Sequence, residues 1–254
     1  MRILVTNDDG IHAPGLEACA RIARALSDDV WVVAPETDQS GVSHSLSLSD
    51  PLRLRKVDER RFAVKGTPTD CVIIAVRHIL PDWKPDLVLS GVNRGQNVAE
   101  DVGYSGTVAG AMEGTILGIP SIALSQAFGP ATRHAPDFGT AEHFAPDIVR
   151  TLLDEGIPPG ILINVNFPPR PADQVTGVAV TAQGRRDQAL MRIDERQDGR
   201  GNPYFWIGFE RRTAESVNGS DLYALDHGRI SITPLRLDMT DEPMMTQLAQ
   251  RFAT

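Results

Sequence analysis

Short aliphatic runs alternate with helical stripes of apolar residues along residues 1–166. Each aliphatic run is typical of a strand buried on both faces, and each ends in polar or glycine residues. Between the runs, apolar residues recur every three or four positions, which predicts amphipathic helices. We therefore expect strands at residues 2–6, 30–34, 86–90, 121–124 and 161–166, and helices at residues 15–26, 67–79, 105–117 and 141–153.

This order of elements predicts an α/β fold. Strands that alternate with helices form parallel β-α-β units, in which the crossover helices cover both faces of the sheet. Residues 52–57 and 61–64 alternate apolar and polar side chains, as antiparallel strands do. We predict a Rossmann-like three-layer α/β/α arrangement around a mostly parallel sheet. Ligands of such sheets bind beyond the carboxyl ends of the strands.

The pattern changes after residue 170. Residues 175–181, 204–209 and 230–233 are predicted as further strands, and the charged stretch 185–202 separates the first two. Residues 242–252 form a predicted terminal helix. We interpret residues 1–254 as one α/β domain, in which residues 170–235 contain a protruding β-hairpin that contacts a neighbouring subunit.

The charge of the chain argues against some partners. Acidic residues outnumber basic ones, 33 to 25, for a net charge of −8. A field of that sign repels polyanions, so we expect neither a nucleic acid polymer nor a membrane as partner. No apolar run approaches the roughly 18 residues of a membrane span, and no secretion signal is evident, so we expect a cytoplasmic protein. Cys19 and Cys71 lie in apolar helical patterns and are interpreted as buried, reduced thiols.

Two adjacent carboxylates, Asp8 and Asp9, follow the first predicted strand. When both are ionised they repel each other, and they are costly to desolvate without a cation. Mg²⁺ and Mn²⁺ favour oxygen ligands, so the pair indicates a divalent metal site. The alternative is that Asn7-Asp8-Asp9-Gly10 supplies turn chemistry and nothing more.

Three further segments carry polar groups near predicted strand or helix ends. The serine-rich loop that includes Ser40 offers hydroxyls, and Asn93 offers a carbonyl oxygen between two glycines. Ser105-Gly106-Thr107 begins a helix, and the free N–H groups and positive dipole end of a helix start bind anions. A parallel sheet would bring all these segments to one rim. Singly, each is also compatible with a solvated loop or with close helix packing.

Several common catalytic motifs are absent from the sequence. There is no G-x-x-x-x-G-K-[ST] phosphate loop and no G-x-G-x-x-G after the first strand. There is also no G-x-S-x-G nucleophile elbow and no H-E-x-x-H zinc motif. His44 and His227 are possible site histidines, although a surface or hydrogen-bonding role is the simpler interpretation.

A set of short motifs runs through the chain in a fixed order. They are NDDG with HAPGL, SGVSHS, GTPTDCV, SGVNRGQN and YSGTVAGAMEG, then LINVNFP, GNPYFWIG and SITPLRLDMT. Together they resemble the SurE family, the survival-protein nucleotidases, over nearly the full chain. The resemblance implies a SurE-like fold. It also implies a divalent-metal-dependent nucleotidase that hydrolyses nucleoside 5′- and 3′-monophosphates and, in some members, short polyphosphate.

The resemblance also implies a site and an assembly. Asp8, Asp9, Ser40 and Asn93 match the metal ligands of the family, which would hold one Mg²⁺ or Mn²⁺ ion per subunit. Asn97 and the turn Ser105-Gly106-Thr107 match its phosphate contacts. The family forms homodimers or homotetramers that exchange C-terminal segments.

The expected mechanism is attack of a metal-oriented water on phosphorus, with Asp8 and Asp9 as the catalytic residues and Asp8 assisting the water. Asn97 and the helix-start N–H groups would stabilise the phosphoryl oxygens. An aspartyl-phosphate intermediate is a rival route, although it usually requires a D-x-D spacing. A non-hydrolysing nucleotide- or metal-sensing module on a flavodoxin-like sheet explains the same strand ends. A scaffolding role explains only the β-rich C-terminal part.

Overall fold

One large sheet organises the chain. The computed structural model describes residues 1–254 except 130–131, 133–134, 187–190, 210–215 and 254. Within these residues the sheet contains β1 (Arg2–Thr6), β2 (Asp29–Pro35), β3 (Arg53–Asp58), β4 (Arg61–Lys65), β5 (Leu87–Arg94), β6 (Ser121–Gln126), β7 (Ile161–Phe167), β8 (Val178–Val180) and β11 (Ile230–Arg236). Their order is β3-β4-β2-β1-β5-β6-β7-β11-β8.

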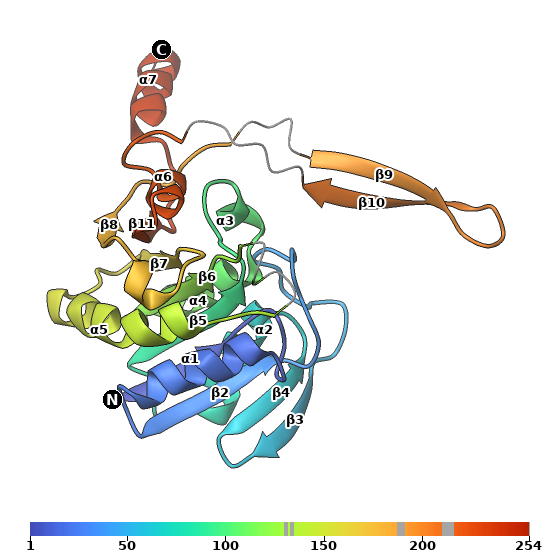
Figure 1. Cartoon of the computed structure of the whole chain (residues 1–254), viewed down its shortest axis with the longest axis vertical. Coiled ribbons are helices and arrows are strands. Elements are labelled where there is room, and N and C mark those ends of the chain that lie inside the picture. The colour runs from blue at the N-terminus through green and yellow to red at the C-terminus, as the bar shows by residue number, and fades with distance from the viewer. Residues whose placement is uncertain (130–131, 133–134, 187–190, 210–215, 254) are drawn as a thin grey trace.

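The central strands of this sheet are parallel. From β4 through β2, β1, β5 and β6 to β7, each strand runs parallel to its neighbours, whereas β3 and β11 pair antiparallel with β4 and β7. Helices α1 (Pro14–Arg24) and α5 (Gly139–Glu155) pack together on one face. Helices α2 (Pro68–Ile74) and α4 (Gly106–Ile116) pack together on the other (Figure 1). This confirms the predicted three-layer α/β/α fold.

Burial on both faces explains the aliphatic strands. In β1, Ile3 and Val5 belong to the core cluster with α1 and α5, whereas Leu4 belongs to the cluster with α2. Cys19 and Cys71 lie in these two clusters as free, buried thiols, and burial raises the pKa of each. Both cysteines are therefore structural, as the sequence predicted.

Local signals in the sequence fix several element ends. Thr67 caps α2: its side chain accepts a hydrogen bond from the Asp70 N–H at 3.2 Å, and the Asp70 carboxylate accepts one from the Thr67 N–H at 2.8 Å. These reciprocal bonds form a capping box. The π-helical turn η1 (Ala75–Ile79) continues the helix, and the terminal helix α7 (Glu242–Phe252) has the predicted bounds.

Other elements were not predicted. They are the short helices α3 (Asp101–Tyr104), η2 (Ala172–Gln174) and α6 (Asp221–Asp226) and the strand β9 (Met191–Gln197). The strand predicted at 175–181 spans only Val178–Val180. β9 lies within the stretch that we had interpreted as a charged separator, and it pairs antiparallel with β10 (Pro203–Phe209). This hairpin projects away from the body of the molecule (Figure 1).

Within the described residues, no helix is both long and apolar enough to span a membrane.

Candidate active site

Asp8 and Asp9 lie just beyond the carboxyl end of β1. Asp8 is only 4% exposed, and its Oδ1 accepts a hydrogen bond from Thr107 Oγ1 at 2.5 Å. Burial, together with the neighbouring charge of Asp9, raises the pKa of Asp8 to about 7. Burial also raises the pKa of Asp9. Two adjacent carboxylates whose charged forms are disfavoured make a favourable place for a cation.

The N-terminus of α4 packs directly against Asp8. A Cβ atom on Gly106 would lie 2.6 Å from Asp8 Cβ, so only glycine allows this approach. Ser105 is the N-cap of α4, and its hydroxyl accepts from the Val108 N–H at 3.0 Å. The Thr107 hydroxyl is therefore engaged as a donor to Asp8, whereas the Ser105 hydroxyl acts as an acceptor and keeps its own O–H donor. The turn can offer a phosphate this O–H group, its backbone N–H groups and the positive end of the helix dipole.

The loop after β2 brings Ser40 to the same turn. The Gln39 N–H donates to the Asp8 carbonyl oxygen at 2.8 Å, and the Ser40 N–H donates to Asp38 Oδ1 at 2.7 Å. Ser40 itself is exposed. The predicted hydroxyl ligand thus belongs to a loop that is hydrogen bonded to the backbone of Asp8.

Asn93, near the end of β5, lies on the other side of the aspartates. Its side-chain nitrogen donates to the Gly95 carbonyl oxygen at 2.9 Å, so the side-chain oxygen keeps its capacity as an acceptor or metal ligand. The N–H of the next residue, Arg94, donates to Asp9 Oδ2 at 3.3 Å. The structure therefore brings Asp8, Asp9, the Ser40 loop and Asn93 to one rim.

Asn97 lies in a buried amide network. Its N–H donates to Asn166 Oδ1 at 2.8 Å, and its side chain donates to Ser125 Oγ at 2.9 Å. Its carbonyl oxygen accepts from the side chains of Asn164 and Asn166. These partners were missed in the sequence, although two asparagines inside an aliphatic strand signal such a network. The contact of Asn97 with phosphate stays a prediction.

A part-buried hydrogen bond between two side chains, also missed in the sequence, joins α4 to the loop after Ser40. His44 Nε2 lies 2.9 Å from Glu113 Oε2, and the Glu113 side chain is only 9% exposed. The other possible site histidine, His227, stacks on Tyr223 and shares a 2.8 Å hydrogen bond with that residue's carbonyl oxygen. Both histidines thus have hydrogen-bonding roles.

The donors at the rim suit a hard cation. They are two carboxylates, an amide oxygen and a hydroxyl, which Mg²⁺ and Mn²⁺ accept as ligands, with water completing the shell. Because all of these donors are oxygen atoms, the residues present fit a magnesium-type site better than a nitrogen- or sulfur-rich zinc site.

A family model described as "Survival protein SurE" matches residues 3–189. The chain belongs to the SurE family. The resemblance stated from the motifs is confirmed. The SurE model ends just before the β9–β10 hairpin begins.

Named relatives of the SurE family match the chain end to end. A 5′-nucleotidase SurE from Azorhizobium caulinodans is 79% identical over 252 residues, 99% of each chain. One from Methylobacterium radiotolerans is 69% identical over the full length of both chains. The crystal structure of the SurE protein from Aquifex aeolicus is 43% identical over 99% of each chain, with a TM-score of 0.85. The SurE-like fold is thus shared over the whole chain.

Proposed function

We propose that this chain hydrolyses nucleoside 5′-monophosphates to nucleoside and phosphate with the help of one bound divalent metal ion. A protein 79% identical along its whole length to a 5′-nucleotidase is itself a 5′-nucleotidase. The observation that carries the metal-dependent mechanism is the contact between the paired aspartates and the start of α4. It joins a cation site to an anion site. We extend the proposal to nucleoside 3′-monophosphates and short polyphosphate, which present the same terminal phosphoryl group.

Asp8, Asp9, Ser40 and Asn93 would hold the ion, either Mg²⁺ or Mn²⁺. When bound, the ion supplies Lewis-acid stabilisation of the phosphoryl oxygens and lowers the pKa of a bound water. Adjacent carboxylates at a strand end serve this purpose without any nitrogen or sulfur ligand.

The protein's own groups would position the phosphate and move the proton. Backbone N–H groups at Gly106 and Thr107 would hold the phosphoryl oxygens, because the helix start offers unpaired donors there. The Thr107 hydroxyl fixes Asp8 through Oδ1, which leaves Oδ2 on the side of the helix start. Asp8 Oδ2 would accept the proton of the attacking water as its oxygen bonds to phosphorus. The bond from phosphorus to the nucleoside oxygen would break, and that oxygen would take a proton from solvent water.

The test is phosphate release from a panel of nucleoside monophosphates with Mg²⁺, with Mn²⁺ and with EDTA. We expect release only with metal, and a loss of more than about 100-fold in Asp9→Asn, because a ligand carboxylate is removed. Asp28→Asn is the matched control, because Asp28 is exposed at the opposite end of β2. Circular dichroism should show that both variants fold.

Two outcomes would reject parts of the proposal. Tight nucleotide binding without release under any metal would favour the non-hydrolysing sensing module. A trapped phospho-enzyme would favour the aspartyl-phosphate route over direct attack by water.

We also propose a cytoplasmic homodimer or homotetramer that acts on free nucleotides rather than nucleic acid polymers or membranes. The net charge of −8 supports free nucleotides over nucleic acid polymers or membranes, because a negative field repels polyanions. The exposed hairpin and terminal helix support an oligomer, because both present apolar side chains that stay exposed among the described residues.

A further inference from the structure

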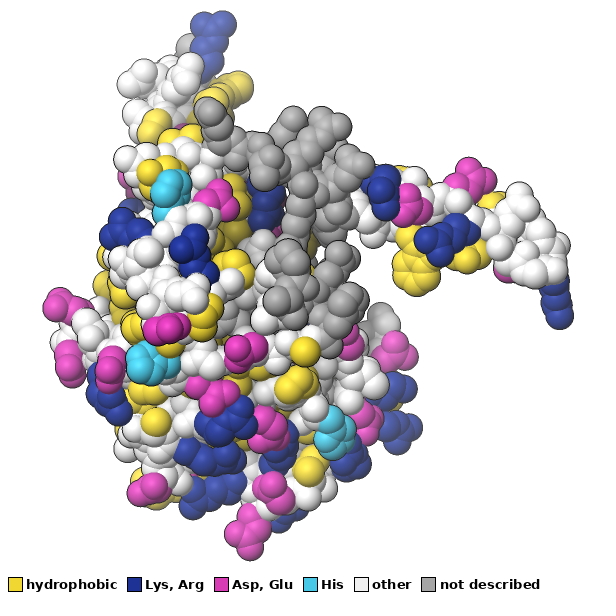
Figure 2. All heavy atoms as spheres, in the orientation of Figure 1, with side chains coloured by type: hydrophobic (Ala, Val, Ile, Leu, Met, Phe, Trp, Pro, Cys, Tyr) yellow, Lys and Arg dark blue, Asp and Glu magenta, His cyan; other side chains and the backbone are white. Residues whose placement is uncertain are grey.

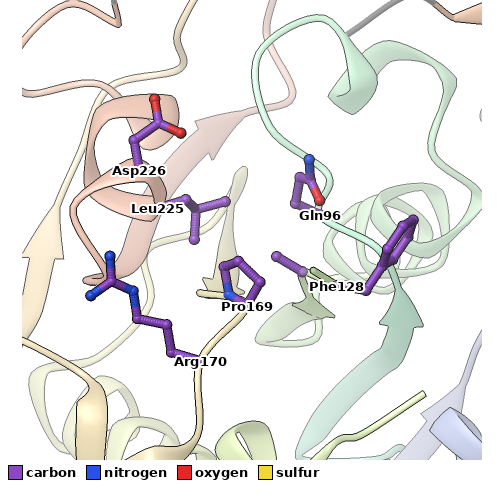
Figure 3. A pocket seen from close by; sticks show the side chains of 7 residues that line it. Gln96, Phe128, Pro169, Arg170, Leu225 and Asp226 are labelled. Atoms are coloured by element: carbon purple, nitrogen blue, oxygen red, sulfur yellow. The ribbon is translucent and has the colours of Figure 1, made fainter. Parts of the chain in front are cut away.

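A pocket of about 230 Å³ opens beside the aspartate site. Gln96, Phe128, Pro169, Arg170, Leu225 and Asp226 line it (Figure 3). These residues follow the carboxyl ends of β5, β6 and β7 or belong to α6. The aspartate site lies at the ends of β2, β1 and β5, and the strand order is β2-β1-β5-β6-β7. The two sites are therefore neighbours along one edge of the sheet and share the turn after β5.

Direct contacts link the pocket wall to the aspartates. A Cβ atom on Gly95 would lie 3.2 Å from Phe128 Cε1, so the Phe128 ring lies against this turn. The Arg94 guanidinium is 5.9 Å from the ring centroid, and the Arg94 N–H donates to Asp9 Oδ2. The turn after β5 therefore connects the aspartate site to the wall of the pocket. In a nucleoside 5′-monophosphate, the group that extends from the phosphate beyond the sugar is the base.

The lining of the pocket suits a flat, polar ring. Phe128, Pro169 and Leu225 supply apolar walls, and an aromatic side chain is a stacking partner for any base. The volume lies below the roughly 300 Å³ at which pockets for drug-sized ligands begin, so one ring system is the fitting occupant.

Gln96 carries an unsatisfied acceptor at this wall. Its side-chain oxygen is buried and has no hydrogen-bond partner within the described part of the chain. A buried acceptor without a partner is costly, and a turn of the Gln96 side chain toward the pocket would let an N–H group of a base satisfy it.

The rim of the pocket carries one donor and one acceptor of opposite charge. Arg170 and Asp226 are both exposed, and the Arg170 guanidinium lies close against Gly228. Arginine only donates hydrogen bonds, whereas an ionised carboxylate only accepts them. The polar edge of a nucleobase matches this pair, because a base presents hydrogen-bond acceptors and N–H donors side by side.

We propose that this pocket binds the base of the nucleotide, with Phe128 as stacking partner and with Arg170 and Asp226 as hydrogen-bonding partners of its polar edge. The proposal rests on the proposed function, since the phosphate must lie at the aspartates. It assigns the substrate class of that same site.

The test compares kcat/KM for GMP, AMP and ribose 5-phosphate, which keeps the phosphoester and sugar but lacks a base. Phe128→Leu should lower kcat/KM for both nucleotides about tenfold through KM, and change that for ribose 5-phosphate by less than about twofold. Asp226→Asn should lower kcat/KM for both nucleotides about fivefold and change that for ribose 5-phosphate by less than about twofold. Trp83→Leu is the matched control, because Trp83 is 71% exposed before the amino end of β5.

The outcomes separate this proposal from the proposed function. Equal losses on all three substrates in Phe128→Leu would overturn the base site. Equal losses on all three, or no loss on the nucleotides, in Asp226→Asn would overturn the role of the pocket rim. If the unmodified protein hydrolyses none of the three substrates, the proposed nucleotidase activity is rejected. Calorimetric measurement of ligand binding in the presence of Mg²⁺ then tests the base pocket by itself. Tighter binding of GMP than of ribose 5-phosphate, lost in Phe128→Leu, would still support it, and equal binding would reject it.

Discussion

Asp8 combines deep burial with an adjacent like charge, and this makes metal-free protein sensitive to pH. The pKa of Asp8 is raised from 3.8 to about 7 in the folded chain. Between these values the folded state binds a proton that the unfolded state does not, so the free energy of unfolding falls as pH rises from about 4 to 7. The loss is at most about 4 kcal/mol.

Urea unfolding in EDTA at pH 5 and pH 7.5 would measure this dependence. Other groups titrate too, so the decisive quantity is the difference between the unmodified protein and Asp8→Asn. We expect the variant to lose less stability over this pH range. Equal losses in both proteins would show that Asp8 ionises normally when the metal is removed.

Gly106 is required by its distance from Asp8 rather than by its backbone angles. A methyl group at this position would overlap Asp8 Cβ, so Gly106→Ala should shift the start of α4 away from the carboxylate. We expect a loss of about 1–3 kcal/mol in stability and a larger proportional loss of activity, measured by thermal unfolding and phosphate release. Gly103→Ala is the control, because a Cβ atom there meets nothing within 4 Å. Similar effects of the two substitutions would contradict this explanation.

The sequence predicted well which residues lie together at the site. It predicted less well which atoms each of these residues contacts. Asp8, Asp9 and Asn93 could be placed because strand ends of a parallel sheet meet at one edge. The contact between Thr107 and Asp8 could not, because a hydroxyl at a helix start is equally able to bind an anion. Glu113 was missed because its partner, His44, is distant in sequence and belongs to a loop without periodicity.

Helices and strands also differ in how well the sequence predicted them. Buried strands and long amphipathic helices were predicted from their apolar spacing, to within a few residues. The short helices α3 and α6 have fewer than two turns, so no periodicity marks them. β9 was missed because its described side chains are mostly charged and largely exposed, so the alternation that marks a half-buried strand is lacking.

The loop of residues 38–49 is held to three helices by a few polar contacts. The Ser43 N–H donates to the Tyr104 carbonyl oxygen, the Ser47 N–H donates to Asp70 Oδ1, and His44 pairs with Glu113. His44→Ala would leave the buried Glu113 carboxylate without this partner, at a cost of about 1–3 kcal/mol. Because Ser40 belongs to the same loop, we expect the metal concentration for half-maximal activity to rise about tenfold.

Hydrogen exchange at the Ser43 and Ser47 N–H groups would report loop release directly. Both should exchange faster in His44→Ala but not in His78→Ala, which replaces an exposed histidine on η1. Unchanged exchange together with weaker metal binding would mean that His44 acts on the site by another route.

The β9–β10 hairpin and the terminal helix α7 are largely exposed to solvent. The hairpin exposes Phe205, Trp206 and Ile207, each by more than half, and no residue of α7 is buried. Hydrophobic side chains are visible on both in Figure 2. An isolated two-stranded hairpin is marginally stable in water, and a lone helix of this length is too. The described contacts within one chain therefore leave both elements short of stabilising partners.

A second copy of the chain would supply those partners, and its presence can be tested by mass. Light scattering after size exclusion should give at least twice the 27.6 kDa of one chain. Leu248→Asp on the apolar side of α7 and Trp206→Ser on the hairpin should each shift the population toward smaller species, because a charge or a lost aromatic weakens an apolar interface. Gln247→Asp and Trp83→Ser are the matched controls, one on the same helix and one on the body of the molecule. A monomer in the unmodified protein, with α7 still protected from hydrogen exchange, would require the helix to be stabilised within its own chain and would exclude subunit exchange.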